Sequence, residues 1–333
     1  MPELPEVEVV RAGLRPAATG AVITGVRVLD ERSLKRHDGP SADFVDRLTG
    51  ATITAAVRRG KFLWFPLDTS ATGAAGTSEG PVALVAHLGM SGQVLLRRRD
   101  AADDRLLRIA LDVEHPERGP LRLAFVDQRI FGSMALDGTV PTLDGRPAGY
   151  AGALLLGSEG ADADPTGTDA DAAAWVRRVP HQVSHIARDP LDPAFDETRV
   201  VDRLLARRTG VKRALLDQGL VSGIGNIYAD ESLWAARVHP EQPTETLGRR
   251  RARTLLAEVR AVLLRALGEG GTSFDAQYVN VNGQAGYFAH SLAAYGRQGE
   301  PCPRCGTPVE RGAFMNRSSH WCPRCQQVRA SGS

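Results

Sequence analysis

Four cysteines near the end of this 333-residue chain constrain its fold more than any other feature. They are its only cysteines and form two C-x2-C pairs, separated by sixteen residues: Cys302, Cys305, Cys322 and Cys325. Each pair can form a tight turn that directs two thiolates at one ion, and two such turns complete a tetrahedral site. The spacing therefore predicts a zinc ribbon that holds one structural Zn²⁺ ion. Because all four ligands are cysteine, no coordination position is left for metal catalysis.

Two other uses of these cysteines fit the sequence less well. Disulfides are disfavoured in a cytoplasmic chain, and a redox C-x-x-C pair needs no second pair in an arginine-rich segment. The chain opens with the acidic segment MPELPE, unlike the basic start of a secretory signal. No apolar run reaches the roughly 18–20 residues of a membrane span. We therefore expect a cytoplasmic protein with no membrane partner.

The charge of the chain is small overall but unevenly placed. The formal net charge is +2, whereas residues 296–329 alone carry six arginines and two glutamates, a net of +4. A basic end on a near-neutral chain predicts a local site for a polyanion. Lysine is rare, since only Lys35, Lys61 and Lys212 occur among 41 basic residues. Each retained lysine is therefore a candidate for a specific role.

Hydrophobic periodicity divides the chain into a β-rich and a helical part. A helix is predicted over 6–14, and short strands follow at 21–29, 51–58, 62–67, 82–87, 93–96, 106–113 and 121–127. These elements favour a β-sandwich or barrel with a leading helix, in an α+β fold. Helical spacing then appears at 198–208, 211–218, 227–237 and 244–267. Two low-complexity insertions, 68–81 and 157–174, are predicted to be loops.

A glycine turn, VSGIGN at 221–226, lies between two helical segments. It is not a dinucleotide motif, because no strand precedes it and Tyr228 occupies the last glycine position. Such a turn exposes backbone N–H groups at a helix start, which suits one phosphate, and Asn226 is positioned to cap that helix. A plain helix–turn–helix joint with glycines for the bend is the alternative.

The first residues are the second unusual feature. Removal of Met1 would leave Pro2 with a free secondary amine, and an α-amine titrates near ~8, so part of it is neutral at pH 7. Such an amine can attack a sugar C1′, and the adjacent Glu3 can protonate the ring oxygen that leaves. The alternative is a disordered, proline-rich start. Between the cysteine pairs, a hairpin tip with Arg317 suits a phosphate backbone or is simply a polar tip.

These motifs, in this order, resemble the formamidopyrimidine-DNA glycosylases of the helix–two-turn–helix superfamily. The resemblance rests on MPELPEVE at the start, RRGK at 58–61, HLGMSG at 87–92, DQRIFG at 127–132, LVSGIGNIYADE at 220–231 and the cysteine unit. It implies a bifunctional DNA glycosylase and AP lyase of base excision repair. Its substrate would be damaged double-stranded DNA, from which it removes oxidised purines (8-oxoguanine and formamidopyrimidines) before strand cleavage by β,δ-elimination.

The resemblance also implies a role for individual residues. Pro2 would be the Schiff-base nucleophile and Glu3 the proton donor, supported by Glu6. Lys61 would bind the lesion phosphate and serve β-elimination, and Arg317 would serve δ-elimination. The remaining expected DNA contacts are Met90, Arg129 and Phe131, which would fill the gap left by a flipped nucleotide, together with Arg207, Lys212 and Asn226.

The implied domain organisation is a β-sandwich catalytic domain (1–156), a linker (157–185), a helix–two-turn–helix domain with a lesion-capping loop (186–293) and a zinc finger (294–329). We expect a monomer, in the cytoplasm of a bacterium and associated with its nucleoid. Three features depart from the family pattern: Ile130 replaces a basic or polar residue, a histidine is missing near 104–106, and both insertions are long. The alternatives are an enzyme similar to endonuclease VIII, acting on oxidised pyrimidines, and a zinc-ribbon DNA-binding protein without activity.

Overall fold

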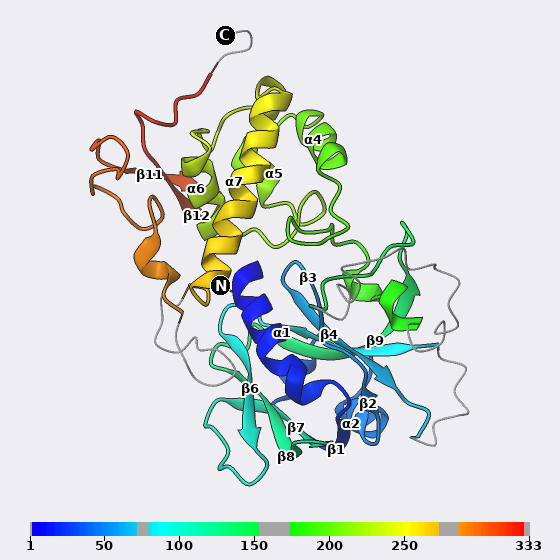
Figure 1. The fold of residues 1–333 in the computed structure, drawn as a ribbon. Helices are drawn as coiled ribbons and strands as arrows, with labels where there is room; N and C mark the ends of the chain where they lie inside the picture. The colour runs from blue at the N-terminus through cyan, green and yellow to red at the C-terminus, as the bar shows by residue number, and fades with distance from the viewer. Residues whose placement is uncertain (1, 72–79, 153–173, 273–285, 330–333) are drawn as a thin grey trace. The chain divides into compact units, whose positions relative to one another are not determined.

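A computed structural model of the chain describes residues 2–71, 80–152, 174–272 and 286–329 (Figure 1). Most of both predicted insertions and most of the predicted capping loop, 273–291, lie outside these ranges. The chain forms two compact units. We call them the N-terminal unit, which contains Pro2 and Glu6–His185, and the C-terminal unit, which contains Glu3–Pro5, Ile186–Phe274 and Gly286–Ser333, within the described ranges.

The N-terminal unit is built mainly from antiparallel strands. Its helices are α1 (Leu4–Ala18, whose first two residues belong to the C-terminal unit), α2 (Ser41–Leu48) and the 3₁₀ turns η1 (Glu31–Leu34), η2 (Ala174–Arg177) and η3 (His181–Val183). Its strands are β1 (Val22–Val28), β2 (Thr52–Ile53), β3 (Val57–Arg59), β4 (Phe62–Asp68), β5 (Val82–His87), β6 (Gly92–Arg98), β7 (Leu107–His115), β8 (Gly119–Asp127), β9 (Ser133–Pro141) and β10 (Arg178–Pro180).

These strands form the expected sandwich. The strand order is β10-β9-β5-β4-β2-β1-β7-β8-β6. The short strand β2 pairs with both β1 and β4, and so joins two halves of the sandwich, β10-β9-β5-β4 and β1-β7-β8-β6. Side chains from both halves, such as Phe65 on β4 and Phe125 on β8, meet in one hydrophobic core. Val7, Val10 and Leu14 of α1 are fully buried in the same core. The apolar face predicted for the leading helix is thus the face that packs.

Two parts of the sandwich differ from the sequence prediction. The single strand predicted over 51–58 is divided into β2 and β3, because three residues lie between Ile53 and Val57 while only two lie between their partners on β4, Leu67 and Trp64. The extra residue interrupts the ladder, as a β-bulge does. Strand β9 and helix α2 were not predicted, although β9 pairs with β5 over six residues.

The C-terminal unit is mainly helical. It contains α4 (Glu197–Leu205), α5 (Val211–Leu215), α6 (Asn226–Ala235), α7 (Arg249–Gly268), the 3₁₀ turns η4 (Thr244–Thr246) and η5 (Phe288–Ser291), and the hairpin strands β11 (Glu310–Phe314) and β12 (Arg317–Trp321). The long helix α7 packs against α4 and α6 (Figure 1). It begins five residues later than the periodicity predicted, because Gly248 adopts a left-handed backbone with φ of +73° immediately before it.

Candidate functional site

The carboxylate of Glu3 lies at the glycine turn before α6. One oxygen accepts a hydrogen bond from the backbone N–H of Gly225 at 2.5 Å, and the other accepts one from Ile227 at 3.1 Å. Glu3 is 2% exposed. A carboxylate is favoured here because the first N–H groups of a helix lack partners and carry partial positive charge. The anion that fills this helix start is therefore a side chain of the protein, and not a phosphate.

Gly225 permits this arrangement for a steric reason. A Cβ at this position would overlap the carboxyl group of Glu3, although the backbone itself, with φ of −124°, is open to any residue. Gly223 is restricted in two ways, because its φ is +88° and a Cβ there would lie 2.6 Å from a side-chain carbon of Leu4. The two glycines thus allow the N-terminal segment to lie against the turn.

Asn226 does not cap α6 as expected, and both Asn226 and Lys212 contact other parts of the C-terminal unit. Asn226 is the first residue of α6 and does not cap it; its amide Nδ2 donates to the carbonyl of Ser318 at 3.0 Å instead. Lys212 is completely buried, and its Nζ lies 2.6 Å from Oδ1 of Asp230. Burial lowers the pKa of Lys212, and the charge of Asp230 opposes that shift. Lys212 is therefore an internal cation in this structure rather than one that faces solvent.

Asp230 links α6 to the zinc-finger hairpin. Besides Lys212, its carboxylate accepts hydrogen bonds from the Ser319 hydroxyl at 3.0 Å and from the backbone N–H of His320 at 2.9 Å. Lys212 also donates to the Ser318 carbonyl at 3.4 Å. These contacts fix β12 on the helix, so the exposed Arg317, the first residue of β12, lies at a supported hairpin tip.

The four cysteines fit the predicted zinc ion. Their Sγ atoms all lie within 4.8 Å of one another, and the closest pairs are 3.5 Å apart. A tetrahedral zinc site with Zn–S bonds of about 2.3 Å needs sulfur atoms about 3.8 Å apart, so the cluster matches this size. Hydrogen bonds from Thr307 lower the pKa of Cys305 to about 6, whereas burial raises the pKa of Cys322 and Cys325, so zinc binding would displace the protons of those two thiols.

In the N-terminal unit, Lys61 lies in the two-residue turn between β3 and β4. The register pairs Arg59 with Phe62, which leaves Gly60, with φ of +57°, and Lys61 at the tip. Phe62 in turn pairs with His87 on β5, and their ring centroids are 4.7 Å apart. The β3–β4 turn thus places Lys61 beside the end of β5. Glu6, which also belongs to this unit, is 3% exposed in the first turn of α1.

His87 is a candidate site residue that the sequence analysis did not single out. Burial, followed by the charges of Arg36, Lys61 and Lys35, lowers its pKa from 6.5 to about 4, so the imidazole is neutral at pH 7. Its Nδ1 accepts the backbone N–H of Gly89 at 3.2 Å, which leaves the proton on Nε2. A neutral ring among three cations can donate to a phosphate oxygen. His87 is the first residue of the HLGMSG motif, but the motif alone does not show which cations surround the histidine.

Met90, Arg129 and Phe131 lie on two neighbouring turns. Met90 belongs to the β5–β6 turn (88–91), and the other two belong to the β8–β9 turn (128–132). Met90 is 45% exposed and Phe131 46%, which is unusual for large apolar side chains. The guanidinium of Arg129 lies 4.8 Å from the centre of the Phe131 ring. The structure therefore groups the three residues as one exposed set.

Buried groups hold these two turns together. Asp127, which is fully buried, accepts hydrogen bonds from the Ser91 hydroxyl at 2.5 Å and from the backbone N–H groups of Arg129 and Gly132 at 3.1 and 2.7 Å. A Cβ on Gly89 would overlap the backbone of the β8–β9 turn. One buried carboxylate thus fixes the backbone that carries the exposed set.

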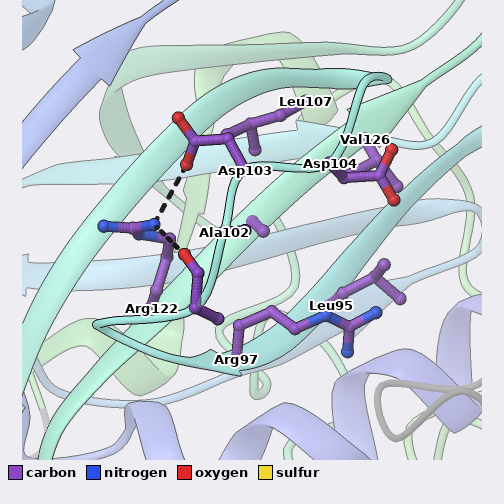
Figure 2. Close-up of a pocket in the computed structure, with 10 residues that line it drawn as sticks. Leu95, Arg97, Ala102, Asp103, Asp104, Leu107, Arg122 and Val126 are labelled. Atoms are coloured by element: carbon purple, nitrogen blue, oxygen red, sulfur yellow. Dashed lines mark hydrogen bonds and ion pairs between the residues drawn. The ribbon is translucent and has the colours of Figure 1, made fainter.

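The β6–β7 loop (99–106) includes the segment in which the family histidine is missing, and part of this loop lines a small hollow (Figure 2). Asp103 and the Ala101 carbonyl both accept from Arg122, at 3.1 and 3.3 Å, and Asp103 also pairs with Arg27 at 2.8 Å. Asp104 accepts from the N–H of Leu106. The loop is therefore tied to the sheet by its own ion pairs, and Arg105 is an exposed cation in the segment where the histidine is missing.

Arg207 lies in the C-terminal unit just after α4. Its Nη2 is 2.6 Å from Oδ2 of Asp217, and both side chains are about one-third exposed. A partly exposed ion pair of this kind contributes little to stability. Arg207 can exchange Asp217 for a phosphate at low cost, which keeps it a candidate DNA contact.

Together, these features define a DNA glycosylase of the helix–two-turn–helix class: a sandwich with a leading Pro-Glu helix, a glycine turn and a four-cysteine finger. Three family models match the chain, described as the formamidopyrimidine-DNA glycosylase N-terminal domain (residues 1–134), its H2TH domain (186–277) and the zinc finger found in FPG and IleRS (299–328). The chain belongs to the formamidopyrimidine-DNA glycosylase family, and it is a DNA glycosylase and AP lyase of base excision repair with one structural zinc ion.

Individual relatives agree with this assignment. The formamidopyrimidine-DNA glycosylase of Leifsonia xyli is 59% identical over 98% of this chain and 100% of its own length, and that of Thermobifida fusca is 50% identical over 98% and 97%. A solved complex of Lactococcus lactis Fpg with abasic-site DNA has a TM-score of 0.71 at 28% identity, covering 98% of this chain and 99% of that one. Among the described residues, no helix is long and apolar enough to cross a membrane.

Proposed function

We propose that this enzyme excises oxidised purines from duplex DNA through a covalent intermediate on Pro2 and then cleaves the strand by β,δ-elimination. The observation that carries the proposal is the fixed carboxylate of Glu3, held by two amides of the glycine turn directly after Pro2 in the chain. A proton carrier next to a secondary amine is the pairing that attack on a sugar C1′ needs.

The first step joins the enzyme to the sugar. The nitrogen of Pro2 attacks C1′, and the bond from C1′ to the damaged base breaks. Glu3 takes the proton that the amine releases and passes it to O4′ as the C1′–O4′ bond opens. The product is an iminium ion between C1′ and Pro2, and the base leaves with a proton from water. The hydrogen bonds from Gly225 and Ile227 favour the ionised carboxylate, which suits its first role as proton acceptor.

The iminium ion then permits strand cleavage. It makes the C2′ proton acidic, and loss of that proton expels the 3′ phosphate; a second elimination expels the 5′ phosphate. Lys61 and Arg317 are proposed to bind these phosphates, because one lies on a tight turn beside His87 and the other is exposed at the hairpin tip. Buried Glu6 is proposed to support the N-terminal segment rather than to contact DNA.

Purines are the proposed substrates because related complexes contain them. Related solved complexes hold DNA that contains Fapy-dG with Lactococcus lactis Fpg and DNA that contains carbocyclic 8-oxo-G with MutM, at TM-scores of 0.72 and 0.71. Another related complex holds an oxidised pyrimidine, so a broader specificity is the second candidate.

We also propose that the enzyme acts as a monomer, since all the proposed catalytic groups come from one chain. Its proposed location is the cytoplasm, where it acts on nucleoid DNA.

A base-release panel combined with borohydride trapping tests the proposal. Duplexes with 8-oxoguanine, a formamidopyrimidine, thymine glycol or a ready-made abasic site are incubated with the zinc-loaded enzyme. We expect release of the purine lesions and a trapped adduct that peptide mapping places on residue 2. Glu3→Gln should lose base release and keep more of the lyase activity on the abasic site. An adduct on Lys61 alone, or faster release of thymine glycol than of both purines, would contradict the proposal.

A further inference from the structure

Lys35 is one of only three lysines in the chain, and the proposed reaction gives it no role. It follows the 3₁₀ turn η1 in the N-terminal unit. Its Nζ donates to the carbonyl oxygens of Ile130 and Phe131, each at 3.0 Å, across 95 and 96 residues of sequence. The ammonium group therefore lies on the backbone of the β8–β9 turn, which carries Arg129 and Phe131 of the exposed set.

The backbone of this turn departs from an extended strand. In an extended chain, neighbouring carbonyl groups point in opposite directions, whereas those of Ile130 and Phe131 both meet the ammonium group of Lys35. Ile130 itself adopts a left-handed conformation with φ of +54°. A β-branched residue rarely adopts positive φ, so the surroundings must hold it there.

The turn is held from two sides. Asp127 accepts hydrogen bonds from the N–H groups of Arg129 and Gly132, and Lys35 donates to the carbonyls of Ile130 and Phe131. A buried anion thus fixes the donors of the turn, while a cation fixes its acceptors. With both in place, the guanidinium of Arg129 lies against the ring of Phe131.

We propose that Lys35 is a positioning residue that holds the β8–β9 turn in the conformation that presents Arg129 and Phe131 together to DNA. The inference rests on the proposed role of these two residues in filling the gap left by the flipped nucleotide. The competing role for Lys35 is direct binding of a DNA phosphate. The two roles differ in which step of the reaction they affect.

The test compares Lys35→Met and Lys35→Arg on a duplex with 8-oxoguanine opposite cytosine. In Lys35→Met we expect the single-turnover excision rate at saturating enzyme to fall about tenfold, the effect of losing one or two net hydrogen bonds. Kd and its salt dependence should change little, and 2-aminopurine beside the lesion should report slower flipping. Lys35→Arg keeps the donors and should restore most of the rate. A weaker Kd with a flatter salt dependence and an unchanged saturated rate would overturn the inference.

A second variant separates local support from loss of charge. Asparagine tolerates positive φ better than isoleucine, so Ile130→Asn should recover part of the rate in the Lys35→Met background. Arg118→Met is the charge-matched control, because Arg118 lies in the β7–β8 turn, at the opposite end of β8 and about 27 Å of extended strand away. This control should excise at the wild-type rate. No recovery from Ile130→Asn would also count against a positioning role.

Phe131→Ala distinguishes failure of this inference from failure of the proposed function. If Phe131→Ala flips and excises normally, the turn does not act on the flipped nucleotide, whatever Lys35 does. If Phe131→Ala is slow while Lys35→Met matches wild type in rate and Kd, only the inference about Lys35 fails. Melting temperatures of all variants, compared with wild type, identify any that have lost their fold.

Discussion

Glu3 and Gly225 are hydrogen-bonded at 2.5 Å, although 222 residues separate them in the sequence. The bond joins the side chain of the N-terminal motif to the backbone of the glycine turn. Two motifs that look independent in the sequence therefore form one structural feature. The glycine is required because any side chain at this position would occupy the place of the carboxylate.

The first prediction concerns this glycine. Gly225→Ala should displace Glu3 and reduce base release at least tenfold, because the added methyl group overlaps the carboxyl group while the backbone angles remain allowed. Binding to abasic-site duplex should change much less. The control is Gly268→Ala at the end of α7, where a Cβ meets nothing within 4 Å. Base release in Gly225→Ala equal to that of the control would show that the position of Glu3 is unimportant.

The second prediction concerns the buried pair of Lys212 and Asp230. Asp230→Ala should destabilise the C-terminal unit by about 3–5 kcal/mol, since it leaves a buried ammonium group without its counter-charge. Urea unfolding of the zinc-loaded full chain measures the change. Replacement of both residues, Lys212→Met with Asp230→Leu, should cost less than Asp230→Ala alone. If the double variant is the less stable of the two, the pair is not coupled as its distance indicates.

The third prediction concerns zinc. We expect one zinc ion per chain, and its removal should abolish DNA binding, because little besides the cysteines forms the core of the finger. Metal analysis followed by fluorescence anisotropy with and without a chelator provides the measurement. Cys305→Ser should behave like the chelated protein, whereas Arg317→Ala should keep its zinc and lose only part of the affinity. Wild-type affinity in metal-free protein would refute this account.

The fourth prediction concerns the base opposite the lesion. Cytosine keeps two acceptors when its partner is removed, and the guanidinium of Arg129 offers a rigid fork of donors, whereas adenine presents a donor amine. Excision should therefore be about ten- to a hundredfold faster opposite cytosine than opposite adenine. Arg129→Ala should reduce this ratio, and Phe131→Ala should slow both duplexes equally. An unchanged ratio in Arg129→Ala would remove Arg129 from base reading.

The fifth prediction concerns His87 and acid pH. Its pKa is about 4 in the folded protein and near 6.5 when unfolded, so the unfolded state binds more protons between these values. The stability that the neutral ring contributes is complete above pH 6.5 and is lost as the pH falls towards 4. His87→Gln should therefore lose less stability between pH 7 and pH 5 than wild type does in urea unfolding. An equal loss in both proteins would mean that His87 titrates normally.

Much of the site was predictable because its signals are local. The cysteine spacing predicts the zinc site, since two C-x2-C turns direct their thiolates without help from the rest of the fold. The apolar face of α1 and the helical spacing of 198–267 likewise follow from periodicity. The start of α7 was predicted too early, because a single glycine with positive φ overrides an apolar pattern that continues through it.

The positions of several charged side chains depend instead on contacts with distant residues, and the sequence around each side chain does not indicate those contacts. Residues close together in the chain encode the zinc ligands and the division into a β-rich and a helical part, so both follow from local patterns, and the adjacency of Pro2 and Glu3 is likewise visible there. By contrast, the fold is needed to show that Glu3 occupies the start of α6, that Lys212 is buried against Asp230, and that Lys35 donates to the β8–β9 turn. Each of these pairs a charged side chain with a distant group, often a backbone N–H or carbonyl. Every residue carries such groups, so sequence cannot indicate which one a charge will meet until the fold brings them together.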